Sequence, residues 1–433
     1  MTECAAVDLR CRPCLIGARL DAGQGQSMGE SAAQQWERYR RALAGAPLPC
    51  ALVDLAAFDR NAETLFAPAR AAGRTVRLAT KSIRVPALVR RLLERGAGTA
   101  RGLMTFTAAE TAFLAAQGFD DLLLAYPTPQ PADCARLAGL CKAGRTVAVA
   151  VDCAAHVDAF AAAGEAAGVQ VPLVIDLDVS YRPLGAAGPH LGVRRSPLRE
   201  VAETVALAKR IAATAGARFA GVLAYEAQVA GLADDQPGDP IGNFGKRLLK
   251  RFSQPRVCES RRALREALGA AGLAPPLFNG GGTGNLAAAA RDPALTEVTA
   301  GSGFLASHLF TAYAGLALEP ALFFALEVTR APGPGFATCH GGGIVASGGA
   351  GPDRLPQPAL PAGLSLLPLE GAGEVQTPLR LPAGLELPLG APVFFRPAKA
   401  GEPLERFNAV LLVEGDQVVD LVPTYRGLGQ AFL

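Results

Sequence analysis

Long uninterrupted apolar runs are missing from this sequence, although half of its 433 residues are hydrophobic. A membrane-spanning helix needs about 18 such residues in a row, so we expect a soluble protein with no membrane partner. Charge of one sign is missing too, because 42 basic residues are mixed with 39 acidic ones and leave a net charge of +3. A nucleic-acid-binding face is therefore not indicated.

A disulfide framework is also absent. The nine cysteines are an odd number without regular spacing, which is typical of reduced thiols and predicts a cytoplasmic protein. The close pair Cys11 and Cys14 has no second pair at zinc-finger spacing. Residues 1–35 lack the apolar core of a signal peptide. We predict a disordered extension there, with Met28 as an alternative start before a helix expected at 32–43.

Short apolar runs alternate with longer segments of helical period from residue 50 to residue 312, which predicts repeated βα units. Several runs are apolar on both faces, and eight such units close most simply into a (β/α)8 barrel. The expected barrel strands lie at 76–80, 100–105, 121–126, 146–151, 172–178, 219–225, 276–279 and 296–299. The expected helices include 85–95, 108–117, 131–140, 154–167, 198–215 and 248–272.

The pattern changes after Tyr313, where proline and glycine interrupt short apolar runs and no long helical segment remains. This change predicts a second domain of antiparallel β structure over 313–433. Its candidate strands lie at 322–329, 343–347, 384–387, 392–396, 408–413 and 417–422.

Lys81 is one of only six lysines, and it closes the expected strand at 76–80 just before a helix. That position puts its amine at the carboxyl end of the barrel, where the active sites of such barrels lie. A lysine whose stem is buried there becomes a candidate nucleophile. A solvated loop lysine is the alternative interpretation of this feature alone.

Two turns rich in small residues follow the last two barrel strands. The first contains Gly281, Gly282 and Thr283, and the second contains Gly301 and Ser302. Glycine lets backbone N–H groups approach a phosphate closely, and phosphate sites in barrels form at these two loops. The pair of turns therefore predicts a phosphate site, with two ordinary glycine turns as the alternative.

Arg182 lies in a mid-barrel loop four residues after Asp178. Its guanidinium suits a phenolate or carboxylate oxygen, although an internal salt bridge with Asp178 would also explain it. His190 precedes Arg194 and Arg195 in the same loop, and this group could bind a substrate carboxylate.

Together these residues resemble the alanine racemase-like (fold type III) pyridoxal phosphate enzymes. The similarity is greatest to their D-threonine aldolase and D-serine dehydratase branch, and within it to sequences called amino acid deaminase/aldolase. The stretches that carry the resemblance are LATKSIRVP around Lys81, GVLAYEAQVAG at 221–231, NGGGTGN at 279–285, GAGEVQTPL at 371–379, PAKAGEPLERF at 397–407 and VPTYRG at 422–427.

The resemblance implies a barrel that binds pyridoxal 5′-phosphate, followed by a β domain that includes the strand expected at 51–55. Lys81 would hold the cofactor as a Schiff base, and Arg182 would bond its phenolic oxygen. The other implied cofactor and substrate contacts are Gly281, Gly282, Thr283, Gly301, Ser302, Tyr225 and Gln228. The catalytic residues would include Lys81 and Tyr225, in a homodimer, and we add His340 of the β domain as a third candidate.

The activity implied is that of a lyase on a small D-3-hydroxy amino acid, by retro-aldol cleavage or by loss of water and ammonia. An amino acid racemase is an alternative, with Tyr313 or Tyr425 as the second acid–base group. A catalytically weak, cofactor-binding protein is another.

The metal implied by the resemblance is in doubt because Pro397 stands where a histidine is expected. Proline neither binds a metal nor transfers a proton. The four histidines, at 156, 190, 308 and 340, share no metal-ligand spacing. His156 is expected on a helix surface. His340 could substitute as base or ligand, and the alternative is an ordinary turn histidine.

Overall fold

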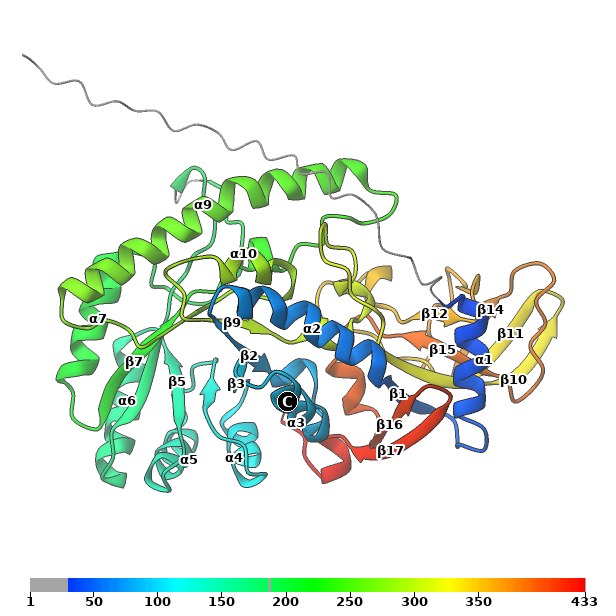
Figure 1. Cartoon of the computed structure of the whole chain (residues 1–433), viewed down its shortest axis with the longest axis horizontal. Helices are drawn as coiled ribbons and strands as arrows, with labels where there is room; N and C mark the ends of the chain where they lie inside the picture. The colour runs from blue at the N-terminus through cyan, green and yellow to red at the C-terminus, as the bar shows by residue number, and fades with distance from the viewer. Residues whose placement is uncertain (1–29, 186–187, 433) are drawn as a thin grey trace, which may run out of the picture.

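The computed structural model describes residues 30–185 and 188–432 and consists of a barrel joined to an antiparallel sheet (Figure 1). Met28, the pair Cys11 and Cys14, and the first 29 residues of the predicted extension lie outside the described residues. The predicted N-terminal helix is present as α1 (Ala32–Ala42), capped by the Ser31 side chain. No helix among the described residues is both long and apolar enough to span a membrane.

Eight parallel strands close the barrel in chain order, which confirms the predicted fold class. They are β2 (Thr75–Ala79), β3 (Ala100–Thr105), β4 (Leu122–Leu124), β5 (Val147–Val151), β6 (Val171–Asp176), β7 (Ala217–Leu223), β8 (Leu277–Gly280) and β9 (Glu297–Ala300). Most of their residues are buried, because the strands face a filled interior on one side and helices on the other.

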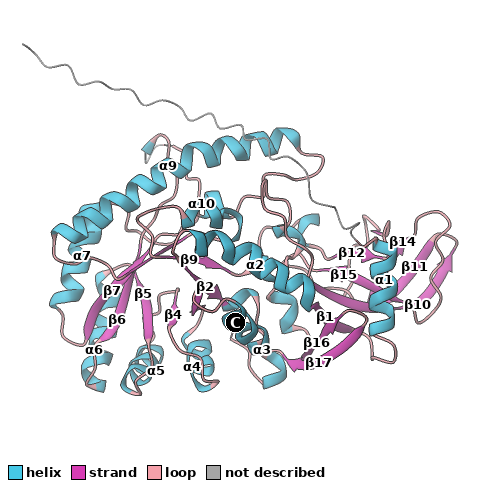
Figure 2. Ribbon diagram, in the orientation of Figure 1, coloured by secondary structure: helices cyan, strands magenta, loops and turns pink. Residues whose placement is uncertain are grey.

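Helices surround the barrel strands (Figure 2). The long ones are α2 (Leu55–Ala71), α3 (Pro86–Arg95), α4 (Ala108–Ala116), α5 (Pro131–Lys142), α6 (Ala154–Ala167), α7 (Val201–Ala213) and α9 (Pro240–Ala270). Three short ones, α8 (Ala227–Ala230), α10 (Leu286–Ala290) and α11 (Ser302–Leu305), follow β7, β8 and β9. Helix α9 begins at Pro240 rather than at the predicted residue 248, because Asp239 caps it and proline fits its first position.

The side chains packed inside the barrel identify which strand positions face inward at its carboxyl end. Leu123, Ala150, Val174 and Leu223 pack together inside it. At its amino-terminal end, the buried Arg77 binds Glu297 at 2.6 Å and Asp121 at 2.9 Å. Since successive side chains of a strand alternate in direction, the next inward positions at the carboxyl end are Asp152, Asp176 and Tyr225.

The second sheet has the order β13-β14-β11-β10-β1-β16-β17, with β15 between β10 and β12. Its strands are β1 (Cys50–Asp54), β10 (Leu322–Gly333), β11 (Phe336–His340), β12 (Gln357–Leu360), β13 (Ser365–Leu366), β14 (Gln376–Arg380), β15 (Pro392–Arg396), β16 (Ala409–Glu414) and β17 (Gln417–Pro423). Strand β1 pairs antiparallel with β10 and parallel with β16.

Two strands predicted in this sheet, at 343–347 and 384–387, are wrong. The first follows Gly341 (φ +83°) and Gly342 (φ +123°), and the second contains Gly384 (φ +80°). These positive φ angles turn the chain out of the extended conformation. The apolar residues that suggested the second strand include Leu387, which is buried in the sheet core from a loop.

Candidate active site

Lys81 lies at the carboxyl end of the barrel, in the 3-10 turn η1 (Thr80–Ser82) that follows β2. Its Nζ donates a hydrogen bond of 2.8 Å to the hydroxyl of Tyr126, which follows β4. The residue itself is exposed. The amine is thus held at the barrel mouth by a partner two strands away and remains open to a ligand.

Arg195 stands between two tyrosines of this mouth. Its guanidinium carbon lies 5.8 Å from the ring centre of Tyr126 and 5.4 Å from that of Tyr225. Arg195 also lines a small cavity with Asp176 and Gln228. An arginine flanked by aromatic rings at a barrel mouth is suited to hold a carboxylate or phenolate oxygen.

Two side chains that line this cavity, Asp176 and Tyr225, have raised pKa values. Burial raises the pKa of Asp176 to about 7, with the charges of Asp152 and Asp178 adding to the shift and Arg195 opposing it. Burial also raises the pKa of Tyr225 to about 12. At neutral pH the Tyr225 hydroxyl is therefore protonated and acts as a hydrogen-bond donor.

The second glycine turn contacts the Lys81 turn, and the first glycine turn contacts the second. A methyl group built on Gly301 would lie 2.9 Å from Cβ of Ala79 and 3.0 Å from Oγ of Ser82. Ser82 and Ser302 are joined through their hydroxyls at 3.1 Å. Thr283 Oγ1 accepts the N–H of Gly303 at 3.2 Å. The ends of β2, β8 and β9 thus gather small side chains and hydroxyls around one space.

Gly281 and Gly282 shape the first turn through the protein's own hydrogen bonds. Gly281 adopts φ +75°, and its N–H bonds a carboxylate oxygen of Glu226 at 3.0 Å. The N–H of Gly282 bonds Oδ1 of Asn285 at 3.0 Å. These two N–H groups therefore hold the turn in shape.

A buried ionic group lies beneath this turn. Glu226 accepts bonds from Arg261 and, at 2.7 Å, from Nδ2 of Asn285. Arg261 also binds Asp292 at 3.2 Å, and all three charged side chains are at most 1% exposed. Sequence reasoning did not identify this group. Only the position of Glu226 beside Tyr225 could have drawn attention to it.

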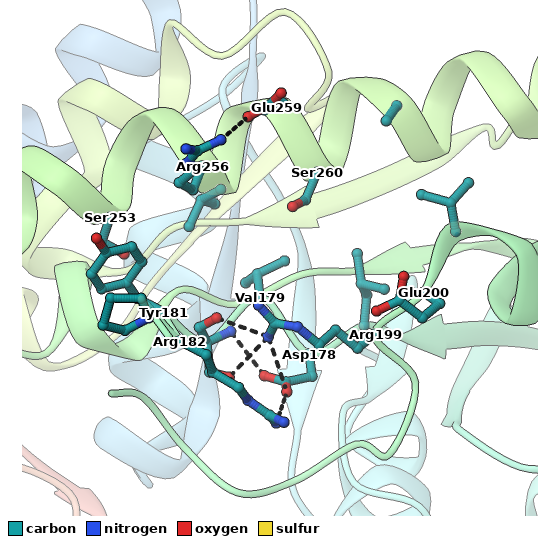
Figure 3. Close-up of a pocket in the computed structure, with 16 residues that line it drawn as sticks. Asp178, Val179, Tyr181, Arg182, Arg199, Glu200, Ser253, Arg256, Glu259 and Ser260 are labelled. Carbon is teal, nitrogen blue, oxygen red and sulfur yellow. Dashed lines mark hydrogen bonds and ion pairs between the residues drawn. The ribbon is translucent and has the colours of Figure 1, made fainter. Parts of the chain in front are cut away.

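The structure pairs Arg182 with side chains of its own loop. Its side chain bonds Asp178 at 2.6 Å and Ser180 at 3.2 Å (Figure 3). It lines a separate cavity of about 470 Å³ between the 177–183 segment and α9. Of the arginines in this loop, Arg195 is the one that the structure brings to Tyr126 and Tyr225.

Gln228 stands in the wall between the two cavities. Its Nε2 donates to the carbonyl of Val179 at 2.8 Å and to Oγ of Ser253 at 3.0 Å. Val179 and its neighbours line both cavities. The amide of Gln228 therefore fixes the segment that separates Arg182 from Arg195.

The two tyrosines considered for proton transfer differ in access. Tyr425 is fully buried and donates to Glu110 at 2.8 Å. Tyr313 is 4% exposed and packs on Gly284 of the glycine turn. Tyr313 thus lies beside the first glycine turn, whereas Tyr425 belongs to the joint between barrel and sheet.

The residues considered for a metal in the sheet domain do not gather there. His340 is exposed on β11, which lies on the far side of the sheet from the barrel (Figure 1). At Pro397, the backbone carbonyl oxygen accepts a hydrogen bond of 3.1 Å from the N–H of His308. Lys399 binds Ser347 at 2.6 Å and Glu402 at 3.1 Å. Over residues 30–185 and 188–432, the donor set expected for a metal in this domain is therefore missing.

Comparison with curated proteins gives two kinds of relative. A 3-hydroxy-D-aspartate aldolase of Paracoccus denitrificans is 29% identical over 240 residues, which cover 55% of this chain and 54% of that protein. A D-threonine aldolase of Arthrobacter sp is 26% identical over 295 residues, covering 67% of this chain and 70% of that protein. The match to the first relative therefore spans about half of its length.

Solved structures with the same fold extend over nearly the whole chain. The D-threonine aldolase from Filomicrobium marinum has a TM-score of 0.74 at 21% identity and covers 89% of this chain and 96% of that one. D-threo-3-hydroxyaspartate dehydratase from Delftia sp. HT23 has a TM-score of 0.69 at 23% identity, covering 88% and 98%. The alanine racemase N-terminal domain family matches residues 53–305, from β1 to the end of α11. This chain belongs to the alanine racemase N-terminal domain family.

Proposed function

We propose that this chain is a pyridoxal phosphate-dependent lyase that acts on a small D-3-hydroxy amino acid. The observation that carries the proposal is the position of the Lys81 amine, which lies at the barrel mouth, bonded to Tyr126. The glycine turn after β9 contacts the same Lys81 turn, and the turn after β8 is bonded to the turn after β9. The names of the relatives, 3-hydroxy-D-aspartate aldolase and D-threonine aldolase, support the substrate class.

The residues of the mouth fit the cofactor. Lys81 supplies the amine, Thr283 and Ser302 supply hydroxyls, and Gly301 leaves room that a side chain would fill. Bound there, the cofactor would withdraw electrons from the bonds at the substrate α-carbon. We assign the phosphate to the space between the two glycine turns, as in other barrels of this type.

The protein's own groups would position the reactants. Tyr126 orients the Lys81 amine, and Arg195 would bind the substrate carboxylate or the phenolic oxygen of the cofactor. Tyr225, protonated at neutral pH, would donate a hydrogen bond from the opposite side of Arg195. Fixed groups of this kind lower the barrier by holding the reacting bond in one orientation.

Retro-aldol cleavage and elimination differ in the group that acts on the substrate hydroxyl. Cleavage needs a base that removes the hydroxyl proton, while elimination needs an acid that protonates the leaving oxygen. His340 stays our candidate for this role. Because it is exposed on β11, far from the Lys81 of its own chain, it would act from a second copy in a homodimer.

Spectra and product analysis test the proposal. Protein purified with the cofactor should show a visible absorption band that Lys81→Ala removes. Incubation with D-threonine and 3-hydroxy-D-aspartate should then give an aldehyde with glycine, or a 2-oxo acid with ammonia. A colourless preparation that does not take up added cofactor would refute the cofactor assignment, and a coloured but inert one would refute the lyase assignment.

Racemisation is the competing activity and has a separate readout. It needs an acid–base group opposite Lys81, and Tyr425 is buried on Glu110, which counts against that tyrosine. Tyr313, beside the glycine turn, is the better candidate. Loss of optical activity from D-alanine, with L-alanine as the sole product, would favour the racemase. A coloured protein without any turnover would favour a binding role.

We also propose that the protein works in a reducing compartment, the cytoplasm, as a homodimer. All six cysteines in the described ranges are free thiols, which supports a reducing environment. Sedimentation of the cofactor-bound protein would test the dimer directly.

A further inference from the structure

Three potential metal ligands meet at the carboxyl end of β5. Asp152 and Cys153 connect β5 to α6, and His156 lies in the first turn of that helix. Oδ1 of Asp152 is 2.9 Å from Nδ1 of His156. One ligand atom from each of the three residues lies within 4.8 Å of the other two. In the described ranges, this is the one group of histidine, cysteine and acidic side chains that comes together in this way.

Helix capping does not account for these side chains. Cys153 is the N-cap of α6, yet its side chain makes no capping hydrogen bond. Nδ1 of His156 is buried without a well-directed hydrogen-bond partner, although Asp152 is close. The two side chains are 16% and 14% exposed. A buried ring nitrogen next to a carboxylate, with no proper bond between them, is suited to share a cation instead.

The neighbouring strand adds negative charge at the same level. Val151 pairs with Ile175, so Asp152 and Asp176 are the next residues in register across β5 and β6. Asp176 makes no side-chain hydrogen bond or ion pair to any residue that the structure describes. Two carboxylates side by side at the rim of the mouth form a site that favours a cation.

We propose that Asp152, Cys153 and His156 bind one divalent transition-metal ion, with Zn²⁺ as the best fit. One thiolate, one imidazole and one carboxylate make up three ligands of a tetrahedral zinc site and leave the fourth position open. The soft thiolate disfavours Mg²⁺ and Ca²⁺, which prefer oxygen ligands. Because Asp152 is an inward position of the barrel, the ion would lie on the rim of the mouth that contains Lys81.

Zinc titration of the reduced, cofactor-bound protein against a chromophoric chelator tests the site. We expect one Zn²⁺ per chain, with affinity at least about tenfold weaker in Cys153→Ser and in His156→Gln. Cys258→Ser on α9 and His340→Gln on β11 are matched controls that should keep the wild-type affinity. Unchanged affinity in both site variants, or loss only in His340→Gln, would overturn the proposal.

Two further measurements keep the test independent of the proposed enzyme activity, and the first of them needs no variant. In the wild-type protein, Zn²⁺ should protect Cys153 from alkylation while Cys258 continues to react, as read by peptide mass spectrometry. Co²⁺ in place of Zn²⁺ should give a sulfur-to-metal charge-transfer band that Cys153→Ser removes. Equal labelling of Cys153 with and without Zn²⁺ would contradict the site, whatever the fate of the visible cofactor band.

Discussion

Gly401 packs directly on the carbonyl oxygen of Lys81, so that a methyl group at residue 401 would overlap that oxygen. The φ of Gly401 is an ordinary −74°, and the close approach alone accounts for glycine here. The same carbonyl accepts a bond from Arg84 at 3.1 Å, and Arg84 binds Glu405 at 2.6 Å. The segment after β15 thus clamps the turn that carries the candidate catalytic amine.

We therefore expect Gly401→Ala to displace the Lys81 turn. Overpacking of this kind costs about 1–3 kcal/mol, and cofactor occupancy should fall together with thermal stability. Gly349→Ala is the control, because a methyl group there meets nothing within 4 Å. Equal cofactor absorbance in the two variants would show that the clamp is unimportant.

Arg195→Gln and Arg182→Gln compare two arginines of one loop. Loss of a charged hydrogen bond to a substrate costs about 1.5–3 kcal/mol, so we expect Arg195→Gln to raise KM by about 10- to 100-fold. Arg182→Gln breaks the bond to Asp178 beside a different cavity and should leave KM nearly unchanged. The opposite ranking in steady-state kinetics would return Arg182 to the role that its motif implied.

Tyr126→Phe removes the hydroxyl that holds Nζ of Lys81. A hydrogen bond of this kind contributes about 0.5–1.5 kcal/mol. We expect the cofactor to remain bound and kcat to fall by no more than about tenfold. Tyr181→Phe, in the wall of the Arg182 cavity, is the control and should keep the wild-type kcat.

Glu226→Gln should destabilise the whole barrel. The change leaves Arg261 buried with only Asp292 as its charged partner, and breaking a buried ion pair costs about 3–5 kcal/mol. Urea denaturation would measure the loss. Glu259→Gln, in an exposed pair with Arg256, should change the free energy of unfolding by less than about 1 kcal/mol, and a similar loss in both variants would contradict this reasoning.

Glu110 predicts a loss of stability as pH rises. Burial raises its pKa from 4.5 to about 7 in the folded protein. Between these two values the unfolded chain has released the proton that the folded chain still holds, so the free energy of unfolding falls through this window and levels off above it. Burial of Asp176 adds an effect of the same sign.

Melting temperatures measured from about pH 5 to about pH 8 check this prediction. Glu110→Gln, which cannot ionise, should lose less stability over the range than the wild-type protein does. A wild-type melting temperature that rises steadily over the same range would contradict the assignment.

The sequence predicted the barrel well because most of its strands are short, largely apolar runs bounded by turns, and burial on both faces needs such runs. The sheet domain was predicted less well. Strands β11 and β14 alternate weakly, and β14 contains Pro378, so neither has the apolar pattern of a buried strand. Their pairing with each other depends on contacts that no local pattern records.

At the candidate site, the chain position of Lys81 and of the glycine turns was enough to place them at strand ends. The sequence did not show whether Arg182 or Arg195 faces the mouth. Both arginines lie in one loop, and only the folded path of that loop decides which one does. The pairing of Glu226 with Arg261 joins a residue that caps α8 to one in α9, and the two are distant in sequence. The same holds for Asp152 and Asp176, which strand register alone brings together.

Strand β1 leaves the ribosome before the barrel, yet both of its partners come after it. Ala51 pairs with Phe324 on one side and with Val410 on the other. During synthesis, the barrel strands therefore emerge while this apolar segment still has two open edges, and such edges favour aggregation. Strand β1 gains its second partner only after β16 (Ala409–Glu414) has been synthesised, so the barrel can close before the sheet does.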